Sequence, residues 1–140
     1  MFLFRSPSTR QLSLGLLLLR IAVGTIFMLH GKQKLFGMGF AGVSGAFSHM
    51  GVPLPGVMGP FVALLEFFGG IALILGLLTR LVSLGFAIDM LVAILLVKLK
   101  GGFSQYELEF LLCVSSAALV FMGGGEFSID AMLGRRKANV

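Results

Sequence analysis

The stretch FVALLEFFGGIALILGLL, residues 61–78, decides what kind of fold this chain can adopt. Glu66 is its one charged residue, and every other position is apolar or glycine. Crossing the hydrocarbon layer of a bilayer takes about 20 mostly apolar residues. The stretch therefore has the length and composition of a transmembrane helix.

Three further stretches have the same character and carry few charges. These are Arg20 in the first, Asp89 and the terminal Lys98 in the second, and Glu107 and Glu109 at the start of the last and shortest one. We expect a single integral membrane domain over residues 1–140. Its four spans are predicted at about residues 12–30, 60–78, 81–99 and 107–123.

The composition of the whole chain agrees with a membrane protein. Hydrophobic residues make up 57% of the 140 residues and charged residues 12%, with a mean hydropathy of +1.02, whereas a soluble domain has about 25% charged residues. This excludes an ordinary soluble domain, a disordered chain and, with Cys113 as the only cysteine, a disulfide-stapled module. The net charge is +5, but the eleven lysine and arginine residues are scattered along the chain. We therefore expect the lipid bilayer and no nucleic acid as a partner.

The long connection between the first two spans contains its own helical signal. Phe36, Phe40, Val43 and Phe47 recur at steps of four, three and four residues, which is the period of an amphipathic helix. We expect a short helix in the membrane interface here, and a glycine-rich ordered loop is the alternative. The predicted fold class is all-α, a four-helix transmembrane bundle with this additional helix.

The distribution of lysine and arginine predicts the orientation of the bundle. Four spans place both termini on one side, together with six basic residues: Arg5, Arg10, Arg80, Arg135, Arg136 and Lys137. The other side has four: Lys32, Lys34, Lys98 and Lys100. Because cytoplasmic loops carry the excess of basic residues, we expect both termini, including a tail over residues 124–140, in the cytoplasm.

Two local similarities indicate an internal duplication. The first and third spans are followed by KLFGMGF (residues 34–40) and KLKGGF (residues 98–103), and Leu-Glu-Phe occurs in both the second and the fourth span. Two helical hairpins related by an axis along the membrane normal would produce this pattern. Chance similarity is the alternative, because Arg20 has no counterpart at the matching place in the third span.

Charged residues inside the spans need an explanation, because each costs at least about 2.5–3.5 kcal/mol at the bilayer centre. Such residues usually face the bundle interior and mark a functional site. Counting 1.5 Å per helical residue, we expect Arg20, Glu66 and Asp89 to meet near the middle of the membrane. The alternative is that Arg20 forms an ion pair with Glu66 or Asp89 that only fixes the packing of the helices.

Three further ionisable residues, Glu109, His30 and Lys34, are predicted to line the route from the outer surface to this cluster. We expect Glu66, Glu109 and His30 to act in proton transfer, and Arg20, Lys34 and Asp89 to bind a ligand. Three carboxylates meet one arginine at depth, so either an outer lysine reaches them or at least one carboxyl is protonated. The spacing of histidine and cysteine gives no metal-ligand motif.

These residues form a pattern that resembles the DoxX family of small bacterial membrane proteins, which includes the DoxD-like subunit of thiosulfate:quinone oxidoreductase. The resemblance runs from about Leu16 to Leu133. It rests on residues 20–24 (RIAVG), 30–35 (HGKQKL), 51–53 (GVP), 66–70 (EFFGG), 75–80 (LGLLTR), Glu109 and residues 123–130 (GGGEFSID).

The resemblance implies a four-helix bundle in the bacterial cytoplasmic membrane and a link to quinone chemistry. The family's polar positions fall on Arg20, Lys34, Glu66, Arg80, Glu109 and Asp130. Asp89 lies outside the family pattern, and the argument for it rests on its place within a span.

The leading hypothesis is a subunit of a quinone-linked membrane oxidoreductase, with no tightly bound cofactor, a diffusible quinone and a redox partner subunit. One alternative is a non-catalytic carrier, receptor or assembly protein that binds a small anionic or lipidic ligand. A purely structural bundle is another. Pairs of small residues four apart, such as Ala72 with Gly76, favour internal packing and a homo-oligomer equally.

Overall fold

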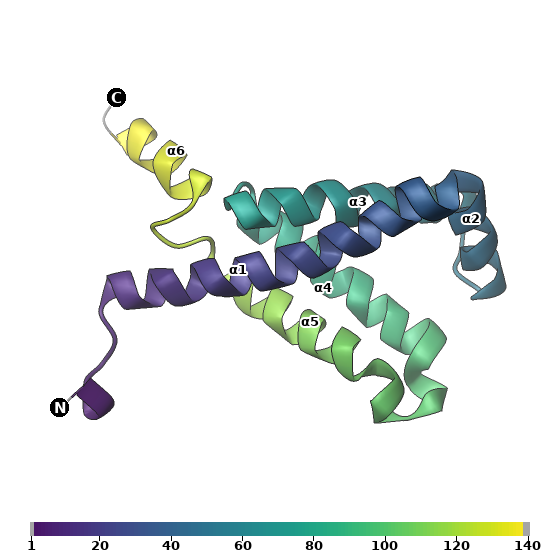
Figure 1. Cartoon of the computed structure of the whole chain (residues 1–140), viewed down its shortest axis with the longest axis horizontal. Coiled ribbons are helices and arrows are strands. Elements are labelled where there is room, and N and C mark those ends of the chain that lie inside the picture. Colours follow the sequence, from purple (N-terminus) through teal and green to yellow (C-terminus); the bar gives the residue numbers. More distant parts are fainter. Residues whose placement is uncertain (1, 139–140) are drawn as a thin grey trace.

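The computed structural model describes residues 2–138, which form helices joined by short connections (Figure 1). Within that range there is no strand, and four helical segments are long and apolar enough to cross a membrane. The all-α class and the four spanning helices are therefore confirmed. The helices are α1 (Thr9–Lys32), α2 (Gly39–His49), α3 (Pro55–Leu75), α4 (Thr79–Ala93), α5 (Phe103–Met122) and α6 (Ile129–Ala138).

Shorter helical segments complete the connections. Two single 3-10 turns, η1 (Phe2–Phe4) and η4 (Leu99–Gly101), lie before α1 and α5 respectively. Two π-helical segments, η2 (Gln33–Met38) and η3 (Ile94–Lys98), continue α1 and α4. Since π segments are rare and occur frequently at functional sites, their position at the ends of two spans favours a functional site near those ends.

The bundle consists of two helix pairs. Helix α1 packs along α3, and α4 packs along α5. The pairs lie close together near the end of the bundle that carries both chain termini, and they diverge toward the other end, where α2 lies (Figure 1).

The first pair is held in backbone contact by small residues. A Cβ atom on Gly70 of α3 would lie 2.6 Å from the carbonyl oxygen of Gly24 on α1, closer than real Cβ atoms come. Gly31 lies equally tightly against the backbone of Glu66 and Phe67. Small residues let membrane helices approach this closely because lipid supplies no hydrophobic force between them.

An aromatic contact joins the two pairs. The rings of Phe27 on α1 and Phe86 on α4 are stacked with their centroids 3.7 Å apart, and both side chains are fully buried. They belong to one core cluster with Val23, Leu73, Val82, Met90, Leu112 and Leu119. Elsewhere the spanning helices expose mostly apolar side chains, as a surface in contact with lipid requires.

The helix expected between the first two spans is present as α2. Val43 is buried, whereas Phe36 and Phe40 are exposed. The periodicity of these residues therefore predicts the helix correctly but only part of its buried face. Helix α2 packs on α3, where Gly59 lies against the backbone of Val43 and Ser44. The glycine-rich loop alternative is wrong.

Two segments differ from expectation. Helix α3 begins at Pro55 rather than near residue 60, because proline is well suited to the first helical position, where its missing N–H is not needed. The region after α5, expected only as a tail, contains α6.

The backbone carries a further sign of internal duplication. Each π segment contains one of the matching lysines, Lys34 in η2 and Lys98 in η3. Each is followed by a glycine in nearly the same conformation, Gly39 with φ 71° and ψ 170° and Gly102 with φ 84° and ψ 169°, and then by phenylalanine. The spacing from the lysine to the glycine differs by one residue, five in the first case and four in the second. The similar backbone geometry at the glycine before each phenylalanine favours duplication over chance similarity.

Candidate functional site: a cavity between the two helix pairs

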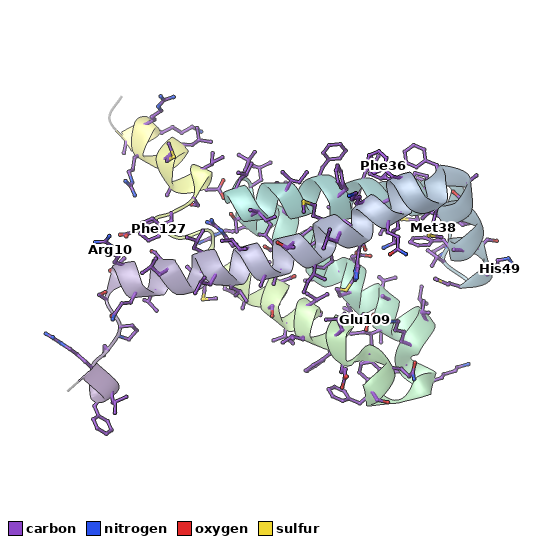
Figure 2. The ribbon with its side chains drawn as sticks, viewed as in Figure 1. Arg10, Phe36, Met38, His49, Glu109 and Phe127 are labelled. Carbon is purple, nitrogen blue, oxygen red and sulfur yellow. The ribbon has the colours of Figure 1, made fainter. Side chains whose placement is uncertain are left out.

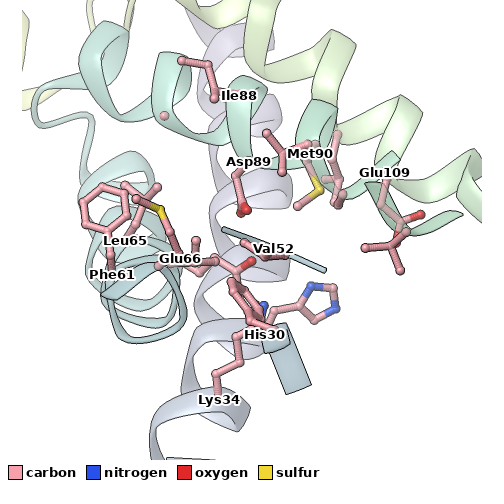
Figure 3. A pocket seen from close by; sticks show the side chains of 18 of the residues that line it. His30, Lys34, Val52, Phe61, Leu65, Glu66, Ile88, Asp89, Met90 and Glu109 are labelled. Carbon is pink, nitrogen blue, oxygen red and sulfur yellow. The ribbon is translucent and has the colours of Figure 1, made fainter. Parts of the chain in front are cut away.

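A cavity of about 640 Å³ lies between the α1–α3 pair and the α4–α5 pair (Figure 3). Most of its wall is apolar, with side chains from α3 and α4 supplying the largest part. Sites for small molecules typically have this size and combine apolar walls with a few placed polar groups. The ionisable residues in the wall are His30, Lys34, Glu66, Asp89, Lys98 and Glu109.

The first polar contact in the wall is an ion pair between Lys34 and Glu66. Lys34 lies one helical turn beyond His30 and so projects from the same side of the chain. The close approach at Gly31 brings this face against α3 beside Glu66. The Glu66 side chain is 2% exposed and that of Lys34 is 24% exposed, so the carboxylate is deep and the ammonium group lies nearer the opening.

A second ion pair joins Lys98 and Glu109 on the other side of the cavity. Glu109 comes from α5 and Lys98 from the π segment that follows α4. Lys98 is absent from the predicted site residues. The sequence held the signal that finds it, because Lys98 begins the KLKGGF segment that matches the segment beginning at Lys34.

The carboxyl groups of Asp89 on α4 and Glu66 on α3 point toward one another (Figure 3). Its Oδ2 atom is enclosed and has no hydrogen-bond partner within the described chain. With three carboxyl groups and two ammonium groups in the wall, both of the latter already paired, the cavity has one acidic group in excess. An unpaired acidic group of this kind is the place for a proton or a hydrogen-bond donor of a ligand.

The structure thus brings five of the six predicted site residues together, and the sixth, Arg20, lies elsewhere. The expected meeting of Arg20 with Glu66 and Asp89 is wrong, because Arg20 is not part of the cavity wall. Side chains of a helix tilt toward its N-terminus. The long side chain of Arg20 consequently extends toward the end of the bundle that carries the termini, away from the cavity.

Arg20 instead binds three main-chain carbonyl groups. Its Nη1 donates to the oxygen of Gly124 at 2.6 Å, and its Nη2 donates to those of Phe127 at 2.9 Å and Ile74 at 3.3 Å. Ile74 lies in the last turn of α3, and Gly124 follows the end of α5. Because the C-terminal end of a helix carries partial negative charge, these carbonyl groups compensate a guanidinium that is only 1% exposed.

Asp130 completes the same end of the bundle. Its carboxylate accepts hydrogen bonds from the main-chain N–H groups of Leu78 and Thr79, both at 2.8 Å, which caps the N-terminus of α4. An acidic group stabilises this end of a helix. The N–H of Asp130 also donates to the oxygen of Gly76 at 2.9 Å. We call the contacts of Arg20 and Asp130 the terminal clamp (the termini and α6 are seen in Figure 2).

Several other polar residues lie outside the cavity wall. Glu107 and His49 are exposed and do not line the cavity. The thiol of Cys113 donates to the oxygen of Ala87 at 3.4 Å. Among the residues that the structure describes, no group of histidine, cysteine and acidic side chains has the arrangement of a metal site.

The fold and the cavity define a small four-span membrane protein in which ionisable side chains meet between two helix pairs. The DoxX family model matches residues 15–99, and the chain belongs to the DoxX family. The matched part contains Arg20 and five of the six ionisable residues that line the cavity, and Glu109 lies beyond it.

Curated proteins from three bacteria are similar over most of their length. The Bacillus subtilis protein named "Putative oxidoreductase CatD" is 34% identical over 132 residues, covering 93% of this chain and 95% of that protein. "Inner membrane protein YqjF" of Escherichia coli is 35% identical over 126 residues, covering 87% and 94%. "Uncharacterized membrane protein Rv3486" of Mycobacterium tuberculosis is 30% identical, covering 84% and 80%. No solved structure matches the chain.

The terminal clamp predicts a structural role for Arg20. Replacing Arg20 by Met leaves the carbonyl groups of Ile74, Gly124 and Phe127 buried without their donor. We expect a loss of at least about 3 kcal/mol of stability, since hydrogen bonds to charged groups contribute about 1.5–3 kcal/mol each. Thermal unfolding in detergent measures the loss, and limited proteolysis should show new cleavage between α5 and α6.

Arg10→Met is the matched control, because Arg10 lies exposed in the first turn of the same helix and its replacement should leave the melting temperature within about 1 °C. Equal stability of the two variants would contradict the structural role of Arg20.

Proposed function

We propose that this chain is the quinone-binding subunit of a membrane oxidoreductase. The observation that carries the proposal is the cavity between the helix pairs, which joins an apolar wall to hydrogen-bond donors and acceptors concentrated on six residues. An isoprenoid quinone has the same two parts, an apolar tail and a ring with two oxygens. The name of the B. subtilis relative, which includes the word oxidoreductase, supports the same class.

The two parts of the ligand have separate partners in the wall. Leu65, Ile88 and Met90 belong to the apolar part, which suits the tail. The ammonium groups of Lys34 and Lys98 hold N–H groups that can donate to a ring carbonyl. Arg20 has no part in this binding, since its guanidinium is used in the terminal clamp.

Reduction of the bound quinone also needs protons. Reduction of a quinone adds two electrons and two protons, so that each ring oxygen gains an O–H bond. The electrons come from a reduced redox centre of a partner subunit. The protons pass through Asp89 and Glu66, which face one another, and through His30 and Glu109, which are more exposed than Glu66. Positioned carboxyl and imidazole groups are suited to such transfer.

The charge balance favours a neutral ligand over a small anion. Both lysines are already paired with carboxylates, and the enclosed oxygen of Asp89 adds a further acceptor. An anion would meet more acidic than basic groups in this cavity. A carrier or receptor for a small anion is therefore less well supported, whereas a neutral lipid bound without electron transfer is an outcome that the binding experiment below distinguishes.

Membrane orientation is part of the proposal. Both termini lie at one end of the bundle (Figure 1), and the excess of basic residues there supports a cytoplasmic location for that end in a bacterial inner membrane. A fluorescent protein that folds only in the cytoplasm should fluoresce when fused after Val140. Activity of a secreted phosphatase at the same position would instead place the termini outside.

Replacing Glu66 by Gln tests the proposed site. Purified full-length chain is titrated in detergent with a short-tailed 1,4-benzoquinone and, in parallel, with the corresponding quinol. We expect the variant to lose at least about tenfold in affinity for the quinol, because the amide no longer offers a charged acceptor to a ring hydroxyl and releases Lys34 from its pair.

Glu107→Gln removes the same charge from an exposed position outside the cavity and should bind like the unaltered chain. The proposal fails if the unaltered chain binds neither oxidation state, or if the two glutamine variants behave alike. Binding of both forms by a chain that never exchanges electrons with any co-purifying subunit would favour the neutral-lipid carrier.

A further inference from the structure

Two equivalent ion pairs line one cavity. Lys34 with Glu66 comes from the α1–α3 pair, and Lys98 with Glu109 comes from the α4–α5 pair. In both cases the lysine lies in a π segment at the end of a span and the glutamate lies in Leu-Glu-Phe on the next spanning helix. The cavity therefore receives the same pair of groups from each of its two halves.

Among the ionisable residues of the cavity wall, the duplication extends only to these pairs. When Lys34 is matched with Lys98 along the chain, Asp89 corresponds to Thr25 and His30 corresponds to Ile94. Asp89 is thus supplied by the second half alone and His30 by the first half alone. The two lysine–glutamate pairs are the feature that the two halves share, which makes them the part of the site suited to a ligand with two similar ends.

We propose that the cavity recognises a 1,4-quinone ring, with one lysine–glutamate pair at each ring oxygen. This inference rests on the proposed function and specifies the substrate class of the same site. The two oxygens of a 1,4-quinone lie at opposite ends of the ring, and the two ion pairs come from the two different helix pairs that enclose the cavity. The oxygens of a 1,2-quinone lie side by side and can meet only one wall.

Each ion pair can serve both oxidation states of an oxygen. The ammonium group has three N–H donors, of which the carboxylate occupies one or two, so one remains for a quinone carbonyl. The carboxylate has two oxygens and accepts from the hydroxyl of the quinol. A lysine alone would favour the quinone and a glutamate alone the quinol, whereas the pair binds either form at the same place.

Three ligands with the same decyl tail test the inference on the full-length chain in detergent. They carry a 1,4-benzoquinone ring, a 1,2-benzoquinone ring, and a ring with a single carbonyl group. We expect the 1,4-quinone to bind about tenfold more tightly than the other two, because it alone engages both pairs and a hydrogen bond from a charged donor is worth about this factor.

Lysine variants distinguish one pair from two. Lys34→Met and Lys98→Met should each lower the affinity for the 1,4-quinone by about tenfold, to the level of the one-carbonyl ligand. That ligand can bind in either orientation, so each single variant should cost it only about twofold in affinity. With both lysines replaced it should lose at least about tenfold.

Two sets of controls separate binding from folding. Lys32→Met and Lys100→Met remove exposed neighbours of the two lysines and should leave all three affinities unchanged. Lys34→Met with Glu66→Gln, and Lys98→Met with Glu109→Gln, remove each pair without leaving an unpaired carboxylate. Each should weaken binding of the 1,4-quinone as much as the single lysine variant does, with the helical circular dichroism signal retained.

The outcomes separate this inference from the proposed function. Loss of affinity in only one of the two lysine variants, or equal binding of the three ligands, overturns recognition at two ends and leaves quinone binding in place. If the unaltered chain binds none of the three ligands, the proposed function fails and the inference fails with it.

Discussion

Hydrocarbon cannot solvate a charge, and this constraint determines where every charged group inside the bundle lies. Each one except Asp89, whose enclosed Oδ2 has no partner within the described chain, finds its compensation within the protein. The chain meets the requirement in two ways. Lys34 with Glu66 and Lys98 with Glu109 form ion pairs, whereas the buried guanidinium of Arg20 is surrounded by carbonyl groups near the ends of two helices. The first solution lines a cavity, and the second fastens helices together.

These two solutions lie at opposite ends of the bundle and separate stability from binding. The terminal clamp joins α1, α3, α4 and the segment after α5 where the helix pairs are close. Because these contacts hold the two helix pairs together at this end, the helix pairs diverge toward the other end (Figure 1). The cavity lies between them. Arg20 and Glu66 are both nearly fully buried, yet substitutions at the two positions should have different consequences because only Glu66 faces the cavity.

Much of this arrangement could be predicted from the sequence, because length and hydropathy determine the spans and the cost of burial draws charges together. The positions of Glu66, Asp89, Glu109, His30 and Lys34 along the spans predict that they lie in one region, and the structure brings them to one cavity. Their roles in binding and proton transfer stay predictions.

The position of Arg20 and the role of Lys98 differ from the prediction, for different physical reasons. Depth counted from the Cα position leaves out the length of the arginine side chain, which reaches more than one helical turn. Because side chains tilt toward the helix N-terminus, the guanidinium of Arg20 finds its partners there. Every residue has a main-chain carbonyl group, so the pattern of charged residues cannot show that carbonyl groups are the partners of Arg20. Lys98 belongs to a repeated segment of the sequence. Its ion pair with Glu109, however, depends on how α4 and α5 pack.

Solid-state NMR of the chain in lipid bilayers, with ¹⁵N in the lysine side chains and ¹³C in the glutamate carboxyl groups, tests most directly whether the two ion pairs exist in a membrane. We expect two close nitrogen–carbon contacts, within about 4 Å as in an ion pair, one absent after Lys34→Met and the other after Lys98→Met. A spectrum with no such contact, or with both contacts retained in either variant, would show that the two pairs do not form.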